Sequence, residues 1–161
     1  MTPLTFSRRA RWFWPLMATI LVTDCATKRA AEARLAPAYV PHPVVGDVVR
    51  LTLSYNSDAA MGLSLGRHSR PALMFLTAVA LLVLAVLYRR TDPANRLAAI
   101  GLALVVGGAL GNLVDRVRSP VGVVDFIDIG IGQFRFWTFN VADVGITLGA
   151  LVLVLALARR P

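Results

Sequence analysis

Four aspartates beside the apolar segments are the strongest candidates for chemistry in this 161-residue chain: Asp24, Asp115, Asp125 and Asp143. Two aspartates that share one proton can activate water for peptide hydrolysis. The ionised carboxylate takes a proton from water, while the protonated one polarises the carbonyl group. Low dielectric and a neighbouring like charge raise the pKa of one of the two carboxyls, which keeps one proton on such a pair near neutral pH.

Other reactive residue types are too few for the remaining common chemistries. The sequence contains no Gly-x-Ser-x-Gly turn, no phosphate-binding glycine loop and no recognisable Ser-His-Asp set. It has 2 histidines, His42 and His68, and 1 cysteine, Cys25, which argues against a zinc site and excludes a disulfide framework. We therefore expect neither a metal nor a cofactor.

The composition indicates a membrane protein. Apolar residues make up 57% of the chain and charged residues only 16%, whereas a typical soluble domain is about a quarter charged. So apolar a chain is also not disordered. A net charge of +8 would suggest nucleic acid as the partner of a soluble protein. With this apolar content we expect membrane lipids as partners, and no nucleic acid.

Four segments predict transmembrane helices, at about 12–30, 72–88, 97–114 and 141–158. About 20 apolar residues cross the hydrocarbon core, with a range that reaches down to roughly 17. The first segment is the least apolar, because Asp24 and Lys28 lie in its last turns. The basic residues before it resemble a cleavable signal peptide. However, Val22-Thr23-Asp24 is a poor match to a lipoprotein cleavage site before Cys25, so we expect an uncleaved helix.

Arginines gather at one end of the predicted spans. They precede the first span, fill the link between the second and third, and follow the fourth; they are Arg8, Arg9, Arg11, Arg89, Arg90, Arg96, Arg159 and Arg160. The outer loops, at about 31–71 and 115–140, carry arginines more thinly and hold most of the acids. The positive-inside rule therefore predicts that both termini are cytoplasmic.

The outer loops predict a small sheet and a short helix. Residues 31–36 favour an interfacial helix, and Val49–Tyr55 alternates as a half-buried strand does. Residues 127–131 and 134–137 predict two more strands, with glycines that allow a turn between them. The predicted fold class is an all-α integral membrane protein, one domain over residues 1–161. It has four transmembrane helices, a small extracytoplasmic β segment and a short interfacial helix.

This topology brings polar residues from four parts of the chain to the outer leaflet. They are Asp24, Lys28, Asn112, Asp115, Arg116, Asp125, Asn140 and Asp143. Ionisable groups are costly in membrane segments and mark functional sites by default. Taken singly, each also fits a plain role: an ion pair between residues four apart, an interface anchor, or a carboxylate that complements a helix dipole. Their convergence at one depth favours a site.

Five blocks of this sequence resemble the lipoprotein signal peptidases of bacteria, also called signal peptidase II. In chain order they are Asp24-Cys25-Ala26-Thr27-Lys28, Tyr55-Asn56-Ser57-Asp58-Ala59-Ala60-Met61-Gly62, Gly107-Gly108-Ala109-Leu110-Gly111-Asn112-Leu113-Val114-Asp115-Arg116, Val123-Val124-Asp125-Phe126-Ile127 and Phe139-Asn140-Val141-Ala142-Asp143. The last three blocks together are highly specific, although each alone would be weak. The blocks run from residue 24 to 143, so the resemblance spans most of the chain.

The resemblance implies an aspartyl endopeptidase of the bacterial cytoplasmic (inner) membrane, with its active site near the outer leaflet. Its substrate would be a prolipoprotein whose cysteine carries diacylglyceryl, cut just before that cysteine. The resemblance implies that Asp125 and Asp143 are the catalytic pair. Residues that bind substrate or support the site would be Asp24, Lys28, Asn56, Asn112, Asp115, Arg116 and Asn140. No cofactor is implied, and a monomer suffices.

Three residues depart from the family pattern. Asp58 and Met61 replace the usual Gly and aromatic residue, and Cys25 stands where Gln is common. These changes bear on contacts with the substrate and inhibitors, not on the aspartate pair. Two alternatives remain: a small ion or proton transporter subunit, or a non-catalytic membrane scaffold of the same fold. A transport path should carry ionisable residues at several depths. The middles and inner halves of spans two to four carry none, which favours a surface-facing site.

Overall fold

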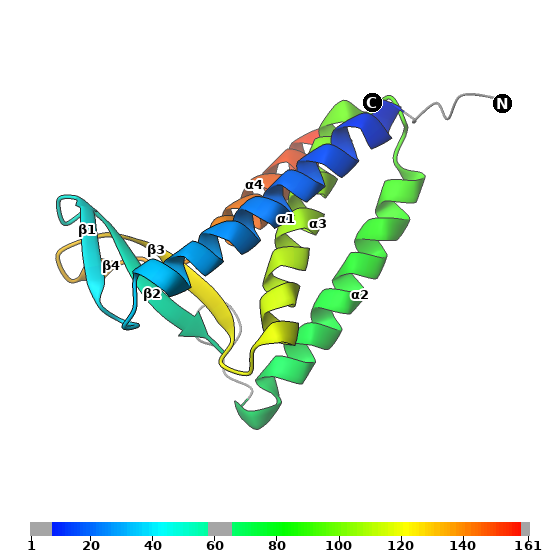
Figure 1. Ribbon diagram of the computed structural model, residues 1–161. Helices are drawn as coiled ribbons and strands as arrows, with labels where there is room; N and C mark the ends of the chain where they lie inside the picture. The colour runs from blue at the N-terminus through cyan, green and yellow to red at the C-terminus, as the bar shows by residue number, and fades with distance from the viewer. Residues whose placement is uncertain (1–7, 58–65, 159–161) are drawn as a thin grey trace.

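Four long helices form the body of the computed structural model, and a small sheet lies at one end of it (Figure 1). The structure describes residues 8–57 and 66–158. The helices are α1 (Arg8–Arg34), α2 (Ser69–Arg90), α3 (Arg96–Arg118) and α4 (Val141–Ala158), and a short 3-10 helix, η2 (Gly66–His68), precedes α2. Helices α1, α3 and α4 pack together, whereas α2 lies to one side and contacts the bundle less closely, mainly through α3 (Figure 1).

Three of the described helices, α2, α3 and α4, are long and apolar enough to cross a membrane. They contain the spans predicted at 72–88, 97–114 and 141–158. The apolar stretch of α2 buries none of its residues against the rest of the described protein. Side chains such as Phe75 and Leu82 are two-thirds exposed there, as expected where lipid takes the place of a protein core. Helix α1 is not among the three, so its crossing stays a prediction.

Helix α1 is longer than the predicted first span and has no break near residue 30. The prediction of a separate interfacial helix at 31–36 is therefore wrong, because residues 31–34 are the last turn of α1. The physical reason is local: Ala30, Ala31, Glu32 and Ala33 all favour helix, and nothing before Leu35 stops it. The extra turn reaches beneath the sheet, where Ala31 is buried.

The sheet has four antiparallel strands in the order β1 (Pro41–Val45), β2 (Val49–Asn56), β3 (Val123–Ile131) and β4 (Phe134–Arg135). The strand predicted at 49–55 is confirmed, and the one predicted at 127–131 begins earlier, at Val123. The strand predicted at 134–137 is shorter, ending at Arg135. The sequence did not predict β1, because Pro41 and Pro43 cannot donate to a ladder; an edge strand tolerates them.

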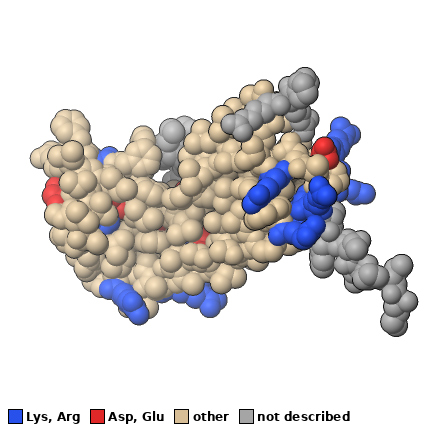
Figure 2. All heavy atoms as spheres, turned by 90° about the horizontal axis from the view of Figure 1, so that it is seen from above, with Lys and Arg blue, Asp and Glu red and all other residues tan. Residues whose placement is uncertain are grey.

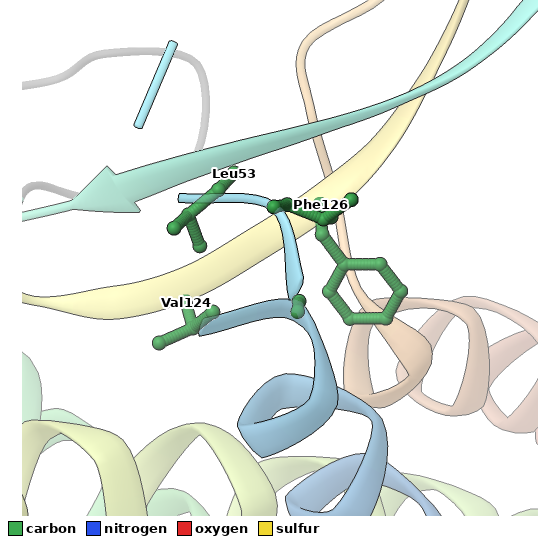
Figure 3. Close-up of a cluster of buried hydrophobic side chains, with 5 residues drawn as sticks. Leu53, Val124 and Phe126 are labelled. Carbon is green, nitrogen blue, oxygen red and sulfur yellow. The ribbon is translucent and has the colours of Figure 1, made fainter. Parts of the chain in front are cut away.

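The buried face of the sheet covers the end of α1. Leu53 of β2 and Val124 and Phe126 of β3 pack there with Ala31 and Leu35 (Figure 3). Successive side chains of a strand point to opposite faces. The contact that fixes Val124 and Phe126 over α1 therefore directs Asp125, between them, to the other side of β3.

Glycines of α3 let its neighbours approach closely. A Cβ at Gly107 would lie 2.8 Å from the Met17 carbonyl oxygen of α1, and one at Gly108 would overlap the Ala142 carbonyl oxygen of α4. Small residues permit this kind of helix contact in membranes. The middle of α3 is thereby held close to α1 and to the first turn of α4.

Candidate active site

The first turn of α4 is fixed by a reciprocal cap. The Asn140 side-chain oxygen accepts the backbone N–H of Asp143 at 3.0 Å, and Asp143 Oδ2 accepts the N–H of Asn140 at 3.2 Å. This is a capping box in which Asp occupies the position more often held by Glu. Asp24 of α1 adds a third bond, accepting the N–H of Ala142 at 2.8 Å. The backbone around Asp143 is thus held by its own helix and by a neighbouring one.

A buried ammonium group joins α1 to α3. Lys28 Nζ lies 2.8 Å from Asp24 Oδ2 and 3.0 Å from Asp115 Oδ2, and it donates to Asn112 Oδ1 at 2.9 Å. These contacts match the three donors of an ammonium group. Asp115 Oδ2 also accepts the N–H of Val124 at 3.1 Å, which ties the cluster to β3. All three charged side chains are buried. The cluster holds α1, α3 and β3 in fixed positions relative to one another.

Two asparagine amides connect this cluster to the other two aspartates. Because the Lys28 ammonium can only donate, it fixes Asn112 Oδ1 as the acceptor and leaves Asn112 Nδ2 to donate. That amide donates to Asp143 Oδ1 at 2.9 Å. Asn140 Nδ2 donates to Asp125 Oδ1 at 2.7 Å and to Asn112 Oδ1 at 3.1 Å. The orientation of both amides, and through them of both carboxylates, follows from one lysine.

Asp125 and Asp143 line the same cavity, which has a volume of about 430 Å³. Asn56, at the end of β2, also lines it and hydrogen-bonds Asp125 through its side chain. Arg116 of α3 contributes a cationic side chain to the wall. The remaining wall is largely apolar and aromatic, formed by Val123, Phe136, Trp137, Thr138, Phe139, Ile146 and Thr147, with Asn112 beside them.

Burial and the charge of Asp143 raise the pKa of Asp125 to about 7, against 3.8 for an ordinary aspartate. Burial is the larger cause, and the hydrogen bonds from Asn140 and Asn56 oppose it by favouring the ionised form. Asp143 instead accepts one N–H bond on each carboxylate oxygen. Burial and the neighbouring carboxylate therefore favour a proton on Asp125 near neutral pH.

The structure brings the nine residues predicted for the site to one end of the helical body. Five reach the cavity wall: Asn56, Asn112, Arg116, Asp125 and Asp143. The other four lie behind them and hold them: Asp24, Lys28, Asp115 and Asn140. Of the three departures, Cys25 lies on α1 and is partly buried, while Asp58 and Met61 fall outside the described residues.

Sequence reasoning missed the aromatic part of the cavity wall. Phe136, Trp137 and Phe139 were expected in or after a strand, but β4 ends at Arg135 and the chain then turns along the cavity. The available signal was a run of aromatics directly before the cap of α4. Within residues 8–57 and 66–158, no cluster of three or more His, Cys, Asp or Glu residues suits a metal ion.

These features define a class: a helical membrane protein whose sheet and helix ends enclose a pair of aspartates. The family model described as Signal peptidase (SPase) II matches residues 16–159, which is most of the chain. The chain belongs to the signal peptidase II family.

Relatives and solved structures agree with this assignment. The chain is 37% identical to the lipoprotein signal peptidase of Desulforapulum autotrophicum, with 86% of this chain and 87% of that protein covered. It is 40% identical to that of Rhodococcus jostii, over 94% of this chain and 74% of the relative. Two solved structures, described as bacterial membrane enzymes determined by the in meso method at 2.3 and 1.9 Å resolution, are each 27% identical. Their TM-scores are 0.80 and 0.79, covering 90% and 91% of this chain and 86% and 92% of theirs.

Proposed function

We propose that this protein is a membrane aspartyl endopeptidase that removes signal peptides from diacylglyceryl-modified prolipoproteins, cutting just before the lipidated cysteine. Membership of the signal peptidase II family supports the activity. The observation that carries the proposal is that Asp125 and Asp143 line one cavity and are held by one amide network. Asp125 and Asp143 are the proposed catalytic residues.

The proposed reaction uses the two carboxyls in different states. Ionised Asp143 takes a proton from water, and the water oxygen attacks the carbonyl carbon of the scissile bond. Protonated Asp125 donates its proton to the carbonyl oxygen, which gives a neutral gem-diol and an ionised Asp125. The gem-diol then returns a proton to Asp125 as its C–N bond breaks, and Asp143 passes its proton to the departing nitrogen. Both carboxyls end in their starting states, and one water is consumed.

The proposed roles of the other predicted residues follow from their contacts. Asn112 and Asn140 orient the two carboxylates, because their amide groups are committed to them. Arg116 and Asn56 line the cavity, so they are placed to bind the substrate backbone. Asp24, Lys28 and Asp115 support the site from behind. The aromatic wall offers apolar contact to a signal peptide or to the lipid on its cysteine.

The proposed topology has four spans, with α1 as the first, and cytoplasmic ends in the inner membrane. Figure 2 shows basic side chains gathered at the end of the molecule away from the sheet, which supports this orientation under the positive-inside rule. The sheet and the cavity then lie at the outer leaflet, where a lipidated cysteine presents its peptide bond. All residues proposed for the site come from one chain, so a monomer suffices. The whole chain is proposed to be a single membrane domain.

The two alternatives are not favoured. The ionisable side chains of α2, α3 and α4 lie near the helix ends, so no relay of charged groups crosses the described part of the bundle, as a transporter would need. A non-catalytic scaffold would have no need for two aspartates in one cavity. Both are present and held by specific hydrogen bonds.

The direct test of the activity uses the purified full-length protein in lipid nanodiscs with a diacylglyceryl-modified prolipoprotein. We expect a shift to the mature form on a gel for wild type and none for Asp125→Asn. The matched control is Asp128→Asn, since Asp128 is a buried aspartate of the same strand that pairs with Arg135 outside the cavity. Undiminished cleavage by Asp125→Asn, or cleavage of the unlipidated substrate at the same rate, would contradict the proposal.

A further inference from the structure

A second cavity lies at the opposite end of the helical body, between the start of α1 and the α2–α3 link. Its volume is about 550 Å³, and its walls are Arg8, Arg11, Trp12, Pro93, Ala94 and Arg96. Three of these six residues are arginines, and Figure 2 shows the densest gathering of basic side chains at this end, with smaller basic groups nearer the sheet. The nearest carboxylate along the chain, Asp92, already accepts the N–H of Ala94 at 2.8 Å.

The walls of this basic cavity are held in place. Arg9 does not line it but donates to the carbonyl oxygens of Tyr88 at 2.8 Å and Thr91 at 2.6 Å, which fastens α1 to the end of α2. Arg96, at the start of α3, stacks over the Trp12 ring with its guanidinium carbon 3.7 Å from the ring centroid. A cation held over an aromatic face keeps its N–H groups free to donate at its edge. The cavity is therefore a built feature rather than a chance gathering of side chains.

The surface beside the cavity is apolar and exposed. Trp12, in the cavity wall, is 42% exposed, and Leu97, next to Arg96 in the chain, is 39% exposed. Tryptophan at this level is typical of the membrane–water boundary. A ligand with an anionic head and apolar tails matches both parts: guanidinium groups bind a phosphate with directed hydrogen bonds, and the flanking aromatics contact acyl chains.

We propose that this cavity binds the phosphate headgroup of one anionic phospholipid, in the leaflet opposite the sheet. The occupant is a lipid rather than a free anion, because the charge faces the cavity while the adjoining surface is apolar. The site is separate from the peptidase cavity and does not rest on the proposed cleavage. A bound lipid joins α1 to α3 at the end where Arg9 joins α1 to α2.

The test is lipid binding to the purified full-length chain in a neutral detergent, followed by native mass spectrometry. Phosphatidylglycerol and phosphatidylcholine with the same acyl chains are titrated separately. We expect wild type to retain one phosphatidylglycerol at least about tenfold more tightly than phosphatidylcholine, since the arginines of the cavity together contribute at least that much beside an anionic headgroup. Equal retention of the two lipids would overturn the proposal.

A matched pair of double variants separates a site from diffuse charge. Arg8→Gln/Arg11→Gln removes two charges from the cavity but leaves the Arg96–Trp12 stack; Arg89→Gln/Arg90→Gln removes two charges from the same end outside it. We expect the first pair to lose the tenfold preference and the second to keep it within about twofold. Equal loss in both pairs would overturn the proposal.

Two further experiments test the identity of the ligand and its position. The first uses only wild type, and the second compares wild type with Trp12→Phe. Millimolar inorganic phosphate should leave the bound phosphatidylglycerol in place; full displacement would mean a free-anion site and overturn the lipid assignment. Phosphatidylglycerol brominated near its headgroup should quench wild-type fluorescence more than that of Trp12→Phe. Equal quenching would contradict binding beside Trp12.

Discussion

The four aspartates at the sheet end of the bundle fall into two pairs that differ in what holds them. Asp24 and Asp115 share one ammonium group, Lys28, at 2.8 and 3.0 Å. Their carboxylate oxygens also accept backbone N–H groups, of Ala142 in α4 and of Val124 in β3. Such a pair is suited to holding these elements together, and neither carboxylate lines the cavity.

The other pair, Asp125 and Asp143, is held by neutral amides. Asn140 and Asn112 donate to these carboxylates without neutralising them. An amide fixes orientation and adds no charge, so burial and mutual repulsion decide where the proton sits. Aspartate therefore serves two purposes in this cluster. Beside the Lys28 ammonium it supports the helices, and beside the asparagine amides it lines the cavity.

The largest expected effect separates the pairs by activity. Asp143→Asn removes the proposed base, so cleavage should fall at least about 10³-fold, while the melting temperature changes little because Asn can still occupy the first turn of α4. Asp115→Asn should do the reverse, losing stability with a smaller loss of cleavage. The measurement is the cleavage rate in nanodiscs beside thermal unfolding of each variant. Equal losses of cleavage rate in the two variants would contradict the division of the aspartates into a catalytic pair and a supporting pair.

Removing the shared cation tests the supporting pair. Lys28→Met leaves Asp24 and Asp115 buried without their ammonium, so the free energy of unfolding should fall by about 3–5 kcal/mol. Chemical denaturation in detergent micelles measures it, with exposed Arg29→Gln as the control on the same helix. Adding Asp24→Asn and Asp115→Asn to Lys28→Met should restore most of the loss, since no unpaired charge then remains buried. A loss below about 1 kcal/mol for Lys28→Met would contradict the account.

The proposed catalytic pair, Asp125 and Asp143, should show a shared proton in the pH dependence of cleavage. The pKa of Asp125 is raised to about 7, so Asp125 is protonated below that pH and ionised above it. Because the reaction needs the protonated acid, the rate should fall about tenfold per pH unit above 7. A rate that rises through pH 7 would contradict the assignment of the proton to Asp125. The rate is measured by gel shift at constant ionic strength.

A smaller effect tests the close packing of α3 against α1 at Gly111. A Cβ at Gly111 would overlap the Asp24 carboxylate, so Gly111→Ala should destabilise the protein by about 1–3 kcal/mol. Val114→Ala, on an exposed position of the same helix, is the control and should cost less. Denaturation midpoints in micelles decide the question. Unchanged stability in Gly111→Ala would mean that α1 and α3 can move apart at no cost.

Much of the site could be predicted from the sequence, because helices of known length bring residues at their ends to one depth. The apolar runs predicted α2, α3 and α4, and an alternating pattern predicted β2. Strand β1 could not be predicted, because Pro41 and Pro43 indicate a loop unless the strand is known to lie at an edge.

The order of contacts within the cluster could not be predicted either. Spacing placed Lys28 near Asp24, but its bonds to Asn112 and Asp115 depend on how closely α1 and α3 pack. The aromatic wall of the cavity could not be predicted for a similar reason. Phe136 and Trp137 reach the cavity only because β4 ends at Arg135. Tertiary packing decided both.

The most direct test of the central claim is a titration of the Asp125 carboxyl, followed by carbon-13 NMR in wild type and in Asp143→Asn. If the two carboxyls act as one pair, the Asp125 signal of wild type should titrate near pH 7, because burial and the charge of Asp143 both raise its pKa. Replacing that charge by an amide should move the transition to lower pH. A transition at the ordinary value near 4 in both proteins would contradict the claim that Asp125 and Asp143 share a proton.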